Sequence, residues 1–210
     1  HKLSPGCYLH ICLKTKKISE ESYWDINEVY NRPKIDISET EAINKTEQLM
    51  QSAYQYRMVS DVPVGVFLSG GYDSSSVAAI LQSTRTERLK TFTIGFHESE
   101  YNEANEAKRI ASFLGTDHHE WYVDAKDAEQ VMTLLPDIYD EPFADNSVVP
   151  TILVSILASK EVKVALSADG GDEIFGGYKK FNQSLRYTTM IPRWAQEALA
   201  STMNLINPER

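Results

Sequence analysis

The sequence is poor in cysteine and in long apolar runs, and both shortages limit what the protein can be. Among 210 residues there are only two cysteines, Cys7 and Cys12, which do not form a CxxC pair. Their offset of five places them on opposite faces of a common strand, so we interpret them as reduced thiols of a cytoplasmic protein. The longest apolar runs, such as residues 148–158, are too short to span a bilayer, and no basic-then-apolar signal segment opens the chain.

Positive charge is also scarce. The chain has 21 basic and 30 acidic residues, for a formal net charge of −9. We therefore expect no nucleic acid and no membrane among its partners, and a phosphate ligand would have to be held locally. An apolar fraction of 42% supports one good-sized domain with an ordinary core. Because the chain begins at His1 rather than Met, we expect it to be a fragment of a longer protein.

Strand and helix patterns alternate from residue 64 onward. We expect strands at residues 64–68, 89–96, 118–123 and 162–166, and helices over about 73–81, 104–114, 127–135 and 148–159. This alternation predicts an α/β fold, a doubly wound parallel sheet with helices on both faces. Ligands of such sheets bind beyond the carboxyl ends of the strands, where two glycine-rich stretches of this sequence fall.

The part of the chain before residue 64 has other patterns. Loose alternation over residues 3–24 predicts a two-stranded hairpin, and the polar stretch 25–37 suits a linker. Residues 38–41, Ser-Glu-Thr-Glu, form a capping box. They begin an amphipathic helix that we expect to continue to about Met58.

The first glycine-rich stretch, residues 69–75, reads Ser-Gly-Gly-Tyr-Asp-Ser-Ser. Its two glycines allow backbone amides to converge, its serines add donors, and the following helix directs its positive end at the turn. These features predict an anion site, most simply for phosphate. The sequence has no GxxxxGK[ST] and no GxGxxG, which disfavours an ordinary P-loop and a dinucleotide site. The alternative interpretation is a tight strand-to-helix turn with Asp73 as the helix N-cap.

The string SGGxDSS after a buried strand is the signature of the PP-loop ATP pyrophosphatases. The second glycine-rich stretch, residues 164–178, reads VALSADGGDEIFGGY. It resembles the S-G-[DE]-G-x-D-E-x-F-G-G-Y string of the glutamine-hydrolysing asparagine synthetase family almost throughout. Further similarities fall in the order of that family at residues 5–8, 23–24, 91–96, 101–103, 114–120, 140–143 and 150. The resemblance covers nearly the whole chain and implies the PP-loop fold, which is similar to that of the adenine nucleotide alpha hydrolases.

The resemblance also implies roles for individual residues. Asp73 and Asp172 match the family's magnesium-binding aspartates, and carboxylate oxygens suit Mg²⁺ on a phosphate chain. N-capping is the structural alternative for both, and is compatible with a metal role. Asp169 matches a position implicated in forming an acyl-adenylate. The implied nucleotide-binding residues are Leu68, Ser69, Gly70, Gly71, Asp73, Ser74, Ile94, Ser167 and Ala168.

Two of these assignments carry a qualification in the residues themselves. Leu68 and Ile94 would bind through backbone groups, since their side chains also suit a strand in the core. The family more often has glycine at the position of Ala168. If that position requires positive φ, alanine destabilises the loop and shifts the nucleotide contact.

Two pairs of residues lie outside these motifs. His118 and His119 could suggest a metal site, but neighbours on a strand point to opposite faces and no third ligand accompanies them, which favours an ordinary strand. Lys179 and Lys180 follow the Gly-Gly turn at residues 176–177 and could reach a phosphate. A solvated pair is the simpler interpretation.

The resemblance divides the chain into two parts. Residues 1–37 resemble the hairpin and linker at the tail of an amidotransferase domain, and residues 38–210 resemble a PP-loop ATP-binding synthetase domain. Nothing after residue 181 matches the family's R-x-P-x-L-D segment or its assisting lysine, so we expect a C-terminal truncation. Neither cysteine has the context of the family's N-terminal nucleophile, which would place the glutaminase domain elsewhere in the same parent chain.

The implied enzyme is an asparagine-synthetase-like ligase that uses ATP and Mg²⁺. It would activate a carboxylate, aspartate by default, as an acyl-adenylate with release of pyrophosphate, and would form the amide with ammonia from glutamine. A homodimer is compatible with this expectation. The open alternatives are a related amidotransferase or β-lactam-synthetase-like enzyme with a different acceptor, and an ATP-binding fragment without turnover.

Overall fold

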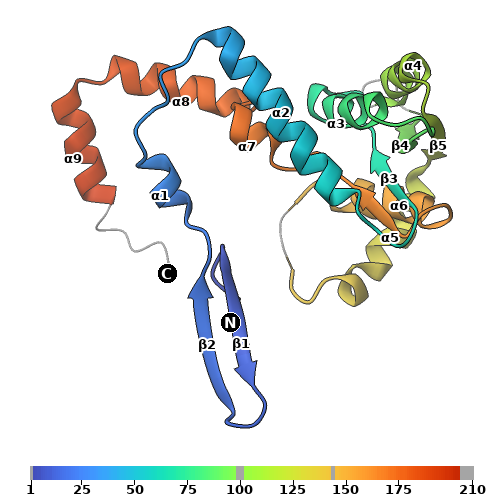
Figure 1. The fold of residues 1–210 in the computed structure, drawn as a ribbon, viewed down its shortest axis with the longest axis horizontal. Helices are drawn as coiled ribbons and strands as arrows, with labels where there is room; N and C mark the ends of the chain where they lie inside the picture. The colour runs from blue at the N-terminus through green and yellow to red at the C-terminus, as the bar shows by residue number, and fades with distance from the viewer. Residues whose placement is uncertain (1, 98–101, 143–144, 204–210) are drawn as a thin grey trace. The chain divides into compact units, whose positions relative to one another are not determined.

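The computed structural model describes residues 2–97, 102–142 and 145–203 (Figure 1). It separates into two compact units, His1–Thr46 and Glu47–Arg210, and the division falls within helix α2 (Glu39–Arg57). Each unit is described by itself. The assignment of residues 1–37 to the tail of an amidotransferase domain stays a prediction.

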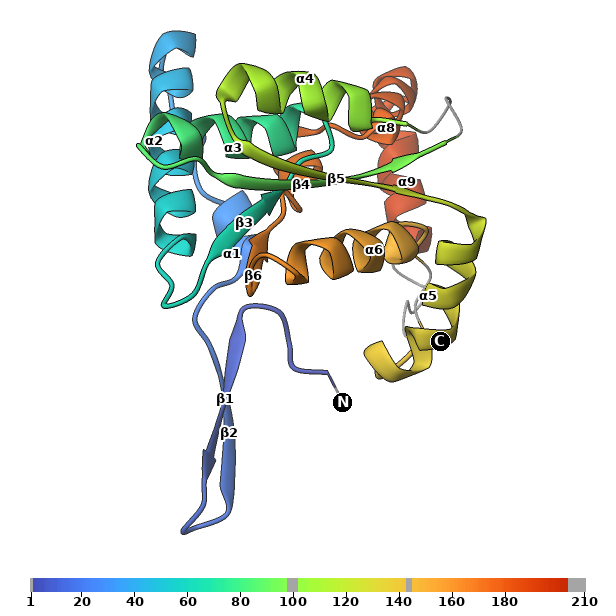
Figure 2. The ribbon, with the colours of Figure 1, turned by 90° about the vertical axis from the view of Figure 1, so that its right-hand side faces the viewer.

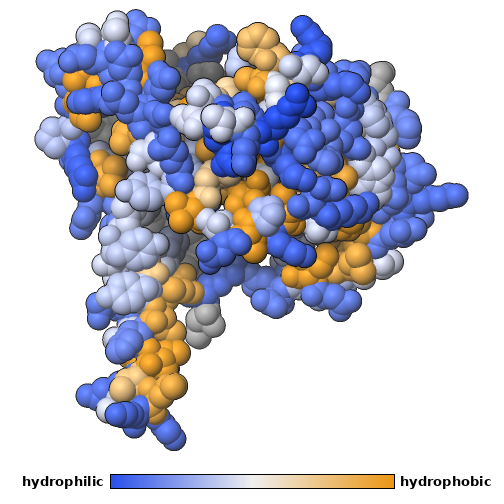
Figure 3. Space-filling view, turned by 45° about the vertical axis from the view of Figure 1, so that its right-hand side comes forward, coloured by the Kyte–Doolittle hydropathy of each residue, from blue (hydrophilic) through white to orange (hydrophobic). Residues whose placement is uncertain are grey.

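The first unit contains the expected hairpin. Strands β1 (Cys7–Cys12) and β2 (Lys17–Ser22) pair antiparallel, from Cys7 opposite Ser22 to Cys12 opposite Lys17. Both cysteines are free thiols. Apolar side chains remain exposed along the hairpin (Figure 3), including Leu9, Ile11 and Ile18.

The stretch after the hairpin differs in part from the predicted linker. It contains a short helix, α1 (Ile26–Tyr30), which begins because the Asp25 side chain accepts a hydrogen bond from the Asn27 amide. The capping box is confirmed. The Glu41 amide donates to Ser38 Oγ at 3.3 Å, and the Ser38 amide donates back to Glu41 Oε2 at 3.2 Å.

The second unit is built on a four-stranded parallel sheet, as predicted. Its strands are β3 (Val64–Phe67), β4 (Lys90–Phe96), β5 (Asp117–Val123) and β6 (Val164–Leu166), in the order β5-β4-β3-β6. The chain proceeds outward from β3 to β5 and then returns to place β6 on the other side of β3. The direction of winding therefore reverses between β3 and β6, which is where doubly wound sheets open a ligand crevice.

Helices cover both faces of this sheet (Figure 2). Helices α3 (Tyr72–Ser83) and α4 (Ala104–Leu114) cover one face, and α5 (Ala125–Ile138) and α6 (Val148–Ser159) cover the other. On the first face the buried core consists of Val66, Leu68, Val77, Ala78, Leu81, Leu89, Ala107 and Ala111. On the second it is divided between a cluster around Val123, Val131 and Leu153 and another around Phe92, Val154 and Val162. The two apolar faces hold the strand ends in fixed positions.

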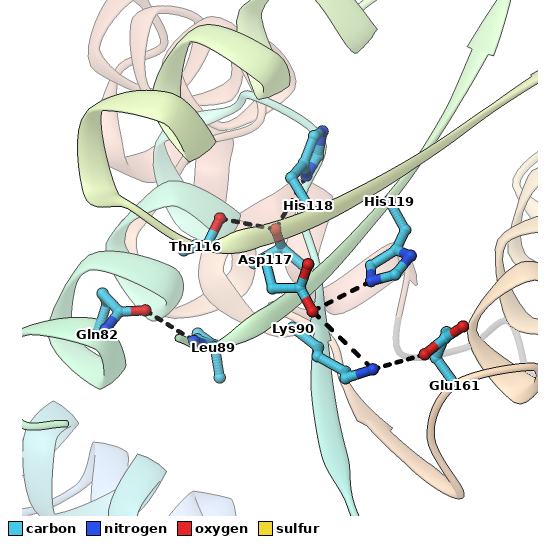
Figure 4. Close-up of polar contacts among 9 residues, drawn as sticks. Gln82, Leu89, Lys90, Thr116, Asp117, His118, His119 and Glu161 are labelled. Atoms are coloured by element: carbon cyan, nitrogen blue, oxygen red, sulfur yellow. Dashed lines mark hydrogen bonds and ion pairs between the residues drawn. The ribbon is translucent and has the colours of Figure 1, made fainter. Parts of the chain in front are cut away.

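Charged groups tie the amino ends of the strands together (Figure 4). Lys90 at the start of β4 forms an ion pair with Glu161, just before β6, and lies 3.9 Å from Asp117 Oδ2 at the start of β5. His119 Nε2 lies 3.4 Å from the same carboxylate oxygen. These contacts lie at the edge opposite the glycine-rich loops, which leaves the carboxyl edge for the site.

The two histidines belong to an ordinary strand, as expected. His118 Nδ1 lies 2.9 Å from the Thr91 hydroxyl, and His119 stacks on Phe92 with ring centroids 5.2 Å apart. Burial lowers the pKa of His118 below its usual value. Because the two rings contact different neighbours, they do not form a metal pair.

Three helices follow β6 that the sequence patterns did not predict. They are α7 (Gly171–Phe175), α8 (Lys179–Met190) and α9 (Arg193–Met203). Among the helices that the structure describes, none combines the length and hydropathy that a bilayer span requires.

Candidate functional site

Both glycine-rich loops line one cleft at the carboxyl edge of the sheet, at the point where the winding reverses. Its volume is about 1060 Å³, at the upper end of the range for small-molecule sites. Every residue that the resemblance marked lines this cleft except Gly70. The marked lining residues are Leu68, Ser69, Gly71, Asp73, Ser74, Ile94, Ser167, Ala168, Asp169 and Asp172.

The first loop, residues 69–74, is held in shape by its own hydroxyls. The Ser69 amide donates to Ser74 Oγ at 3.1 Å, the two serine hydroxyls lie 2.9 Å apart, and the Gly71 amide donates to Ser69 Oγ at 3.3 Å. Helix α3 has Gly71 as its N-cap, with no side-chain cap. The first amides of a helix have no intrahelical acceptor, so those of α3 remain available to an anion in the cleft.

Gly70 does not line the cleft, and its contacts show how the first loop packs against α4. Its φ is +87°, and a β-carbon there would lie 2.9 Å from the Ala107 amide nitrogen and 3.0 Å from Glu106 Cβ. Glycine at this position therefore lets the first loop lie directly against the first turn of α4.

Neither magnesium candidate is an N-cap, which corrects the structural alternative for both. Asp73 is the second residue of α3, after the N-cap Gly71, and Asp172 is the second residue of α7, after the N-cap Gly170. The N-cap residues are glycines in both helices: Gly71 is extended, with φ −71° and ψ 164°, and Gly170 is left-handed, with φ +93°. Both carboxylates are therefore not used to satisfy the helix termini.

The two loops meet through the Asp73 carboxylate, and Asp172 makes a similar contact within the second loop. A β-carbon on Gly171 would lie 2.4 Å from Asp73 Oδ2, so the carboxylate of the first loop rests on the backbone of the second. In the same way, a β-carbon on Gly177 would lie 1.9 Å from Asp172 Oδ1. Because residues 171 and 177 are glycines, there is space for the Asp73 and Asp172 side chains. The first of these contacts places Asp73 next to Gly171, the residue before Asp172.

The second loop, residues 167–178, also fixes Asp169. The Ser167 hydroxyl donates to Asp169 Oδ2 at 2.8 Å. The concern about Ala168 does not arise, because Lys16 is the one non-glycine residue with positive φ in the part of the chain that the structure describes. Alanine is therefore accommodated at residue 168 without left-handed strain.

Leu68 follows β3 directly, and Ile94 lies within the neighbouring strand β4. The Leu68 amide donates to the Phe92 carbonyl at 2.9 Å, and the buried Thr93 hydroxyl donates to the Leu68 carbonyl. In a continued parallel ladder the Ile94 amide would donate to that carbonyl. Thr93 is thus a site residue that the sequence reasoning missed. The sequence does not show to which carbonyl the hydroxyl of a threonine in a strand will donate a hydrogen bond.

Carboxylates dominate the cleft, and sequence reasoning missed two of them. Glu103 and Glu173 join Asp73, Asp169 and Asp172, whereas the described lining residues include no lysine, arginine or histidine. The Tyr178 hydroxyl donates to Glu173 Oε1 at 2.7 Å. This hydrogen bond, with burial and the neighbouring carboxylates, raises the pKa of Tyr178 to about 12, and it lowers the pKa of Glu173.

The donor set fits a nucleotide with a magnesium ion better than a metal held by protein alone. In the described parts of the chain, no group of three or more His, Cys, Asp or Glu side chains could hold a metal ion. Mg²⁺ normally binds one or two carboxylates and completes its shell with water and substrate phosphates. Asp73 and Asp172 follow two different strands and supply such a partial set.

Comparisons with known sequences agree on one family. Residues 45–208 match the family described as asparagine synthase. A protein named putative asparagine synthetase [glutamine-hydrolyzing] 2, from Methanocaldococcus jannaschii, is 41% identical over 170 residues, which are 79% of this chain and 32% of that protein. Asparagine synthetase [glutamine-hydrolyzing] 1 of Bacillus subtilis is 35% identical over 154 residues, 72% of this chain and 24% of its own length. The chain thus spans a third or less of these relatives.

Among solved structures, a glutamine-dependent NAD+ synthetase from Acinetobacter baumannii in complex with ADP is similar at 20% identity and a TM-score of 0.48. The match covers 81% of this chain and 31% of that one. Because this TM-score is below 0.5, the assignment rests on sequence. With more than half of its residues matched, the chain belongs to the asparagine synthase family.

Proposed function

We propose that this chain carries the ATP-splitting site of a ligase that activates a carboxylate, aspartate by default. In the proposed reaction a carboxylate oxygen attacks the α-phosphorus of ATP. The new O–P bond forms as the bond to the bridging oxygen breaks, and pyrophosphate leaves. Ammonia derived from glutamine then attacks the acyl carbon, displaces AMP and forms the amide.

One observation carries this proposal: the Asp73 carboxylate rests on the Gly171 backbone at the switch point of the sheet. This contact brings a serine- and glycine-rich anion loop and an acidic loop to one place. A polyphosphate can bind to the converging amides and hydroxyls of the anion loop. A divalent cation can bind to the carboxylates of the two loops. Membership of the asparagine synthase family supports the same conclusion.

Roles follow for the residues that line the cleft. The first loop and the α3 amides would bind the departing pyrophosphate, where negative charge develops. Leu68 and Ile94 would lie against the adenine, although the Leu68 amide and carbonyl are already hydrogen-bonded to Phe92 and Thr93 of β4. Ser167 and Ala168 would lie on the ribose side. We assign Asp169, held by the Ser167 hydroxyl, to the formation of the acyl-adenylate. Mg²⁺ held by Asp73 and Asp172 would neutralise phosphate charge.

The wider assembly is part of the same proposal. We expect a glutaminase domain in the same parent chain to supply the ammonia, and a homodimer is compatible with this arrangement. A cytoplasmic location is supported by the two free cysteines, since oxidising compartments favour disulfides.

Exchange of labelled pyrophosphate into ATP tests the activation step. The parent protein that contains these residues is incubated with Mg²⁺, ATP and a panel of carboxylic acids that includes aspartate. We expect exchange that depends on one acid. Binding of ATP without exchange by any acid would leave only a nucleotide-binding module and would contradict the proposed activity.

A different acceptor is the second candidate. A relative with another name, Amidase chry2 of Gibberella zeae, is 33% identical over 199 residues, which are 86% of this chain and 29% of that protein, so sequence similarity alone does not fix the acceptor. Exchange driven by an acid other than aspartate in the same panel would support this alternative.

A further inference from the structure

We propose that Lys180 is the cation that binds the terminal phosphates of the nucleotide. The inference rests on the proposed function and adds a residue that the family motif does not assign. Lysines 179 and 180 follow the second loop, and a solvated pair was the simpler interpretation from sequence. The structure gives the two lysines different surroundings.

The cleft has a shortage of positive charge. Five carboxylates line it, from Asp73, Glu103, Asp169, Asp172 and Glu173, and no basic side chain is among the described lining residues. ATP adds about four negative charges near neutral pH, and one Mg²⁺ offsets two of them. A cation of this chain close to the phosphates would offset part of this charge, because like charges at short range in a partly desolvated cleft repel strongly.

Lys180 is next to the wall of the cleft. Its Nζ lies 4.6 Å from the ring centroid of Tyr178, which lines the cleft, and 6.0 Å from that of Phe181. The two rings meet edge to face at 5.4 Å. Tyr178 is itself held by its hydrogen bond to Glu173. The ammonium is thus supported on a fixed aromatic surface, and the positive charge of Lys180 contributes to lowering the pKa of Glu173.

A chain of contacts connects Lys180 with the first loop, the proposed phosphate-binding element. Asp73 of the first loop rests on Gly171, and Asp172 rests on Gly177. Gly177 precedes Tyr178, over whose ring the ammonium lies. Leu68 and Ile94, the proposed adenine contacts, take no part in this chain of contacts: Leu68 follows β3 and Ile94 lies in β4.

Helix stability does not explain this lysine. Lys180 is in the first turn of α8, where the helix dipole disfavours positive charge. An anion in front of this turn removes that disadvantage, since it would contact both the ammonium and the positive end of the helix.

The test compares three ligands by calorimetry: MgATP, magnesium pyrophosphate and AMP. In the full protein, Lys180→Met should weaken MgATP and pyrophosphate binding by roughly fivefold or more, as expected for a partly exposed charge pair. AMP binding should be unchanged, because AMP lacks the terminal phosphates. Lys180→Arg should retain most of the affinity, and Lys179→Met is the matched control with no expected effect.

The outcomes separate this inference from the proposed function. If the unaltered protein binds neither MgATP nor pyrophosphate, the proposed function is wrong. If it binds both and Lys180→Met binds both equally well, Lys180 is not a phosphate-binding residue. Equal weakening of AMP and pyrophosphate by Lys180→Met would show a structural role of the Tyr178–Lys180 contact and would also overturn the inference.

Discussion

Replacing Gly171 by alanine should separate the stability of the protein from its ability to bind MgATP. The added β-carbon would lie 2.4 Å from Asp73 Oδ2 and 2.6 Å from its Cγ. Ordinary contacts between heavy atoms are about 3.5 Å, so the carboxylate has to move by roughly 1 Å. The Asp73 side chain can rotate, so the backbone of either loop need not shift.

The expected changes in stability and in binding have opposite signs. Gly171 is the first residue of α7, and alanine in a helix is more stable than glycine by up to about 1 kcal/mol. The free energy of unfolding should therefore stay the same or rise. A displacement of about 1 Å at a reacting group reduces rates by roughly 100-fold, and we expect MgATP affinity to fall by roughly 10- to 100-fold.

Urea denaturation and calorimetric titration with MgATP measure the two quantities. Gly115→Ala is the matched control, because residue 115 has φ +72° with nothing within 4 Å of an added β-carbon. Left-handed strain there should lower stability by about 1 kcal/mol and leave MgATP affinity unchanged.

A double-mutant cycle completes this experiment. In an Asp73→Ala background, Gly171→Ala should leave the remaining, magnesium-independent ATP affinity unchanged, since both changes act through the same carboxylate. If Gly171→Ala leaves MgATP affinity unaltered in the otherwise intact protein, the contact between the loops does not position the metal-binding group.

Two further predictions concern the framework of the site. Thr93→Val removes the hydroxyl that donates to the buried Leu68 carbonyl, so it should destabilise the fold by about 1–2 kcal/mol in urea denaturation, and an unchanged midpoint would contradict this role. Burial lowers the pKa of His118 below its ordinary value of 6.5, so the folded protein binds that proton less tightly than the unfolded chain does. The free energy of unfolding should therefore be highest above about pH 6.5 and decline as the pH falls below it. His118→Gln should reduce this decline between pH 7.5 and pH 5, and an identical pH dependence in the variant would refute the assignment.

Much of the sheet could be predicted from the sequence because short strand patterns alternate with helical periods, with apolar residues prominent in β3 and β6. Gly115 illustrates why helix ends were also predictable: it closes α4 in the left-handed conformation that favours glycine. Both loops were found from their glycines and serines. The parallel sheet then brings their strand ends to one edge without further information, as the observed pairing of β3 with β6 shows.

The contacts within the site were not predictable, because they depend on tertiary packing. A preference for aspartate at N-caps suggested Asp73, but Gly71 takes that position and leaves the carboxylate free to meet Gly171. The sequence alone does not show that Gly171 accommodates the side chain of Asp73, which lies about 100 residues earlier in the chain. The bond from Thr93 to Leu68 is of the same kind, since it joins residues whose sequence patterns indicate only buried strands.

The proposed function requires that the two loops, joined through Asp73, form a magnesium-dependent ATP site. Calorimetric titration with ATP in the presence and absence of Mg²⁺, for the unaltered protein and for Asp73→Asn, tests it most directly. We expect magnesium-dependent binding in the first and none in the second, with an unchanged circular dichroism spectrum. Magnesium-dependent binding that persists in Asp73→Asn would contradict the account.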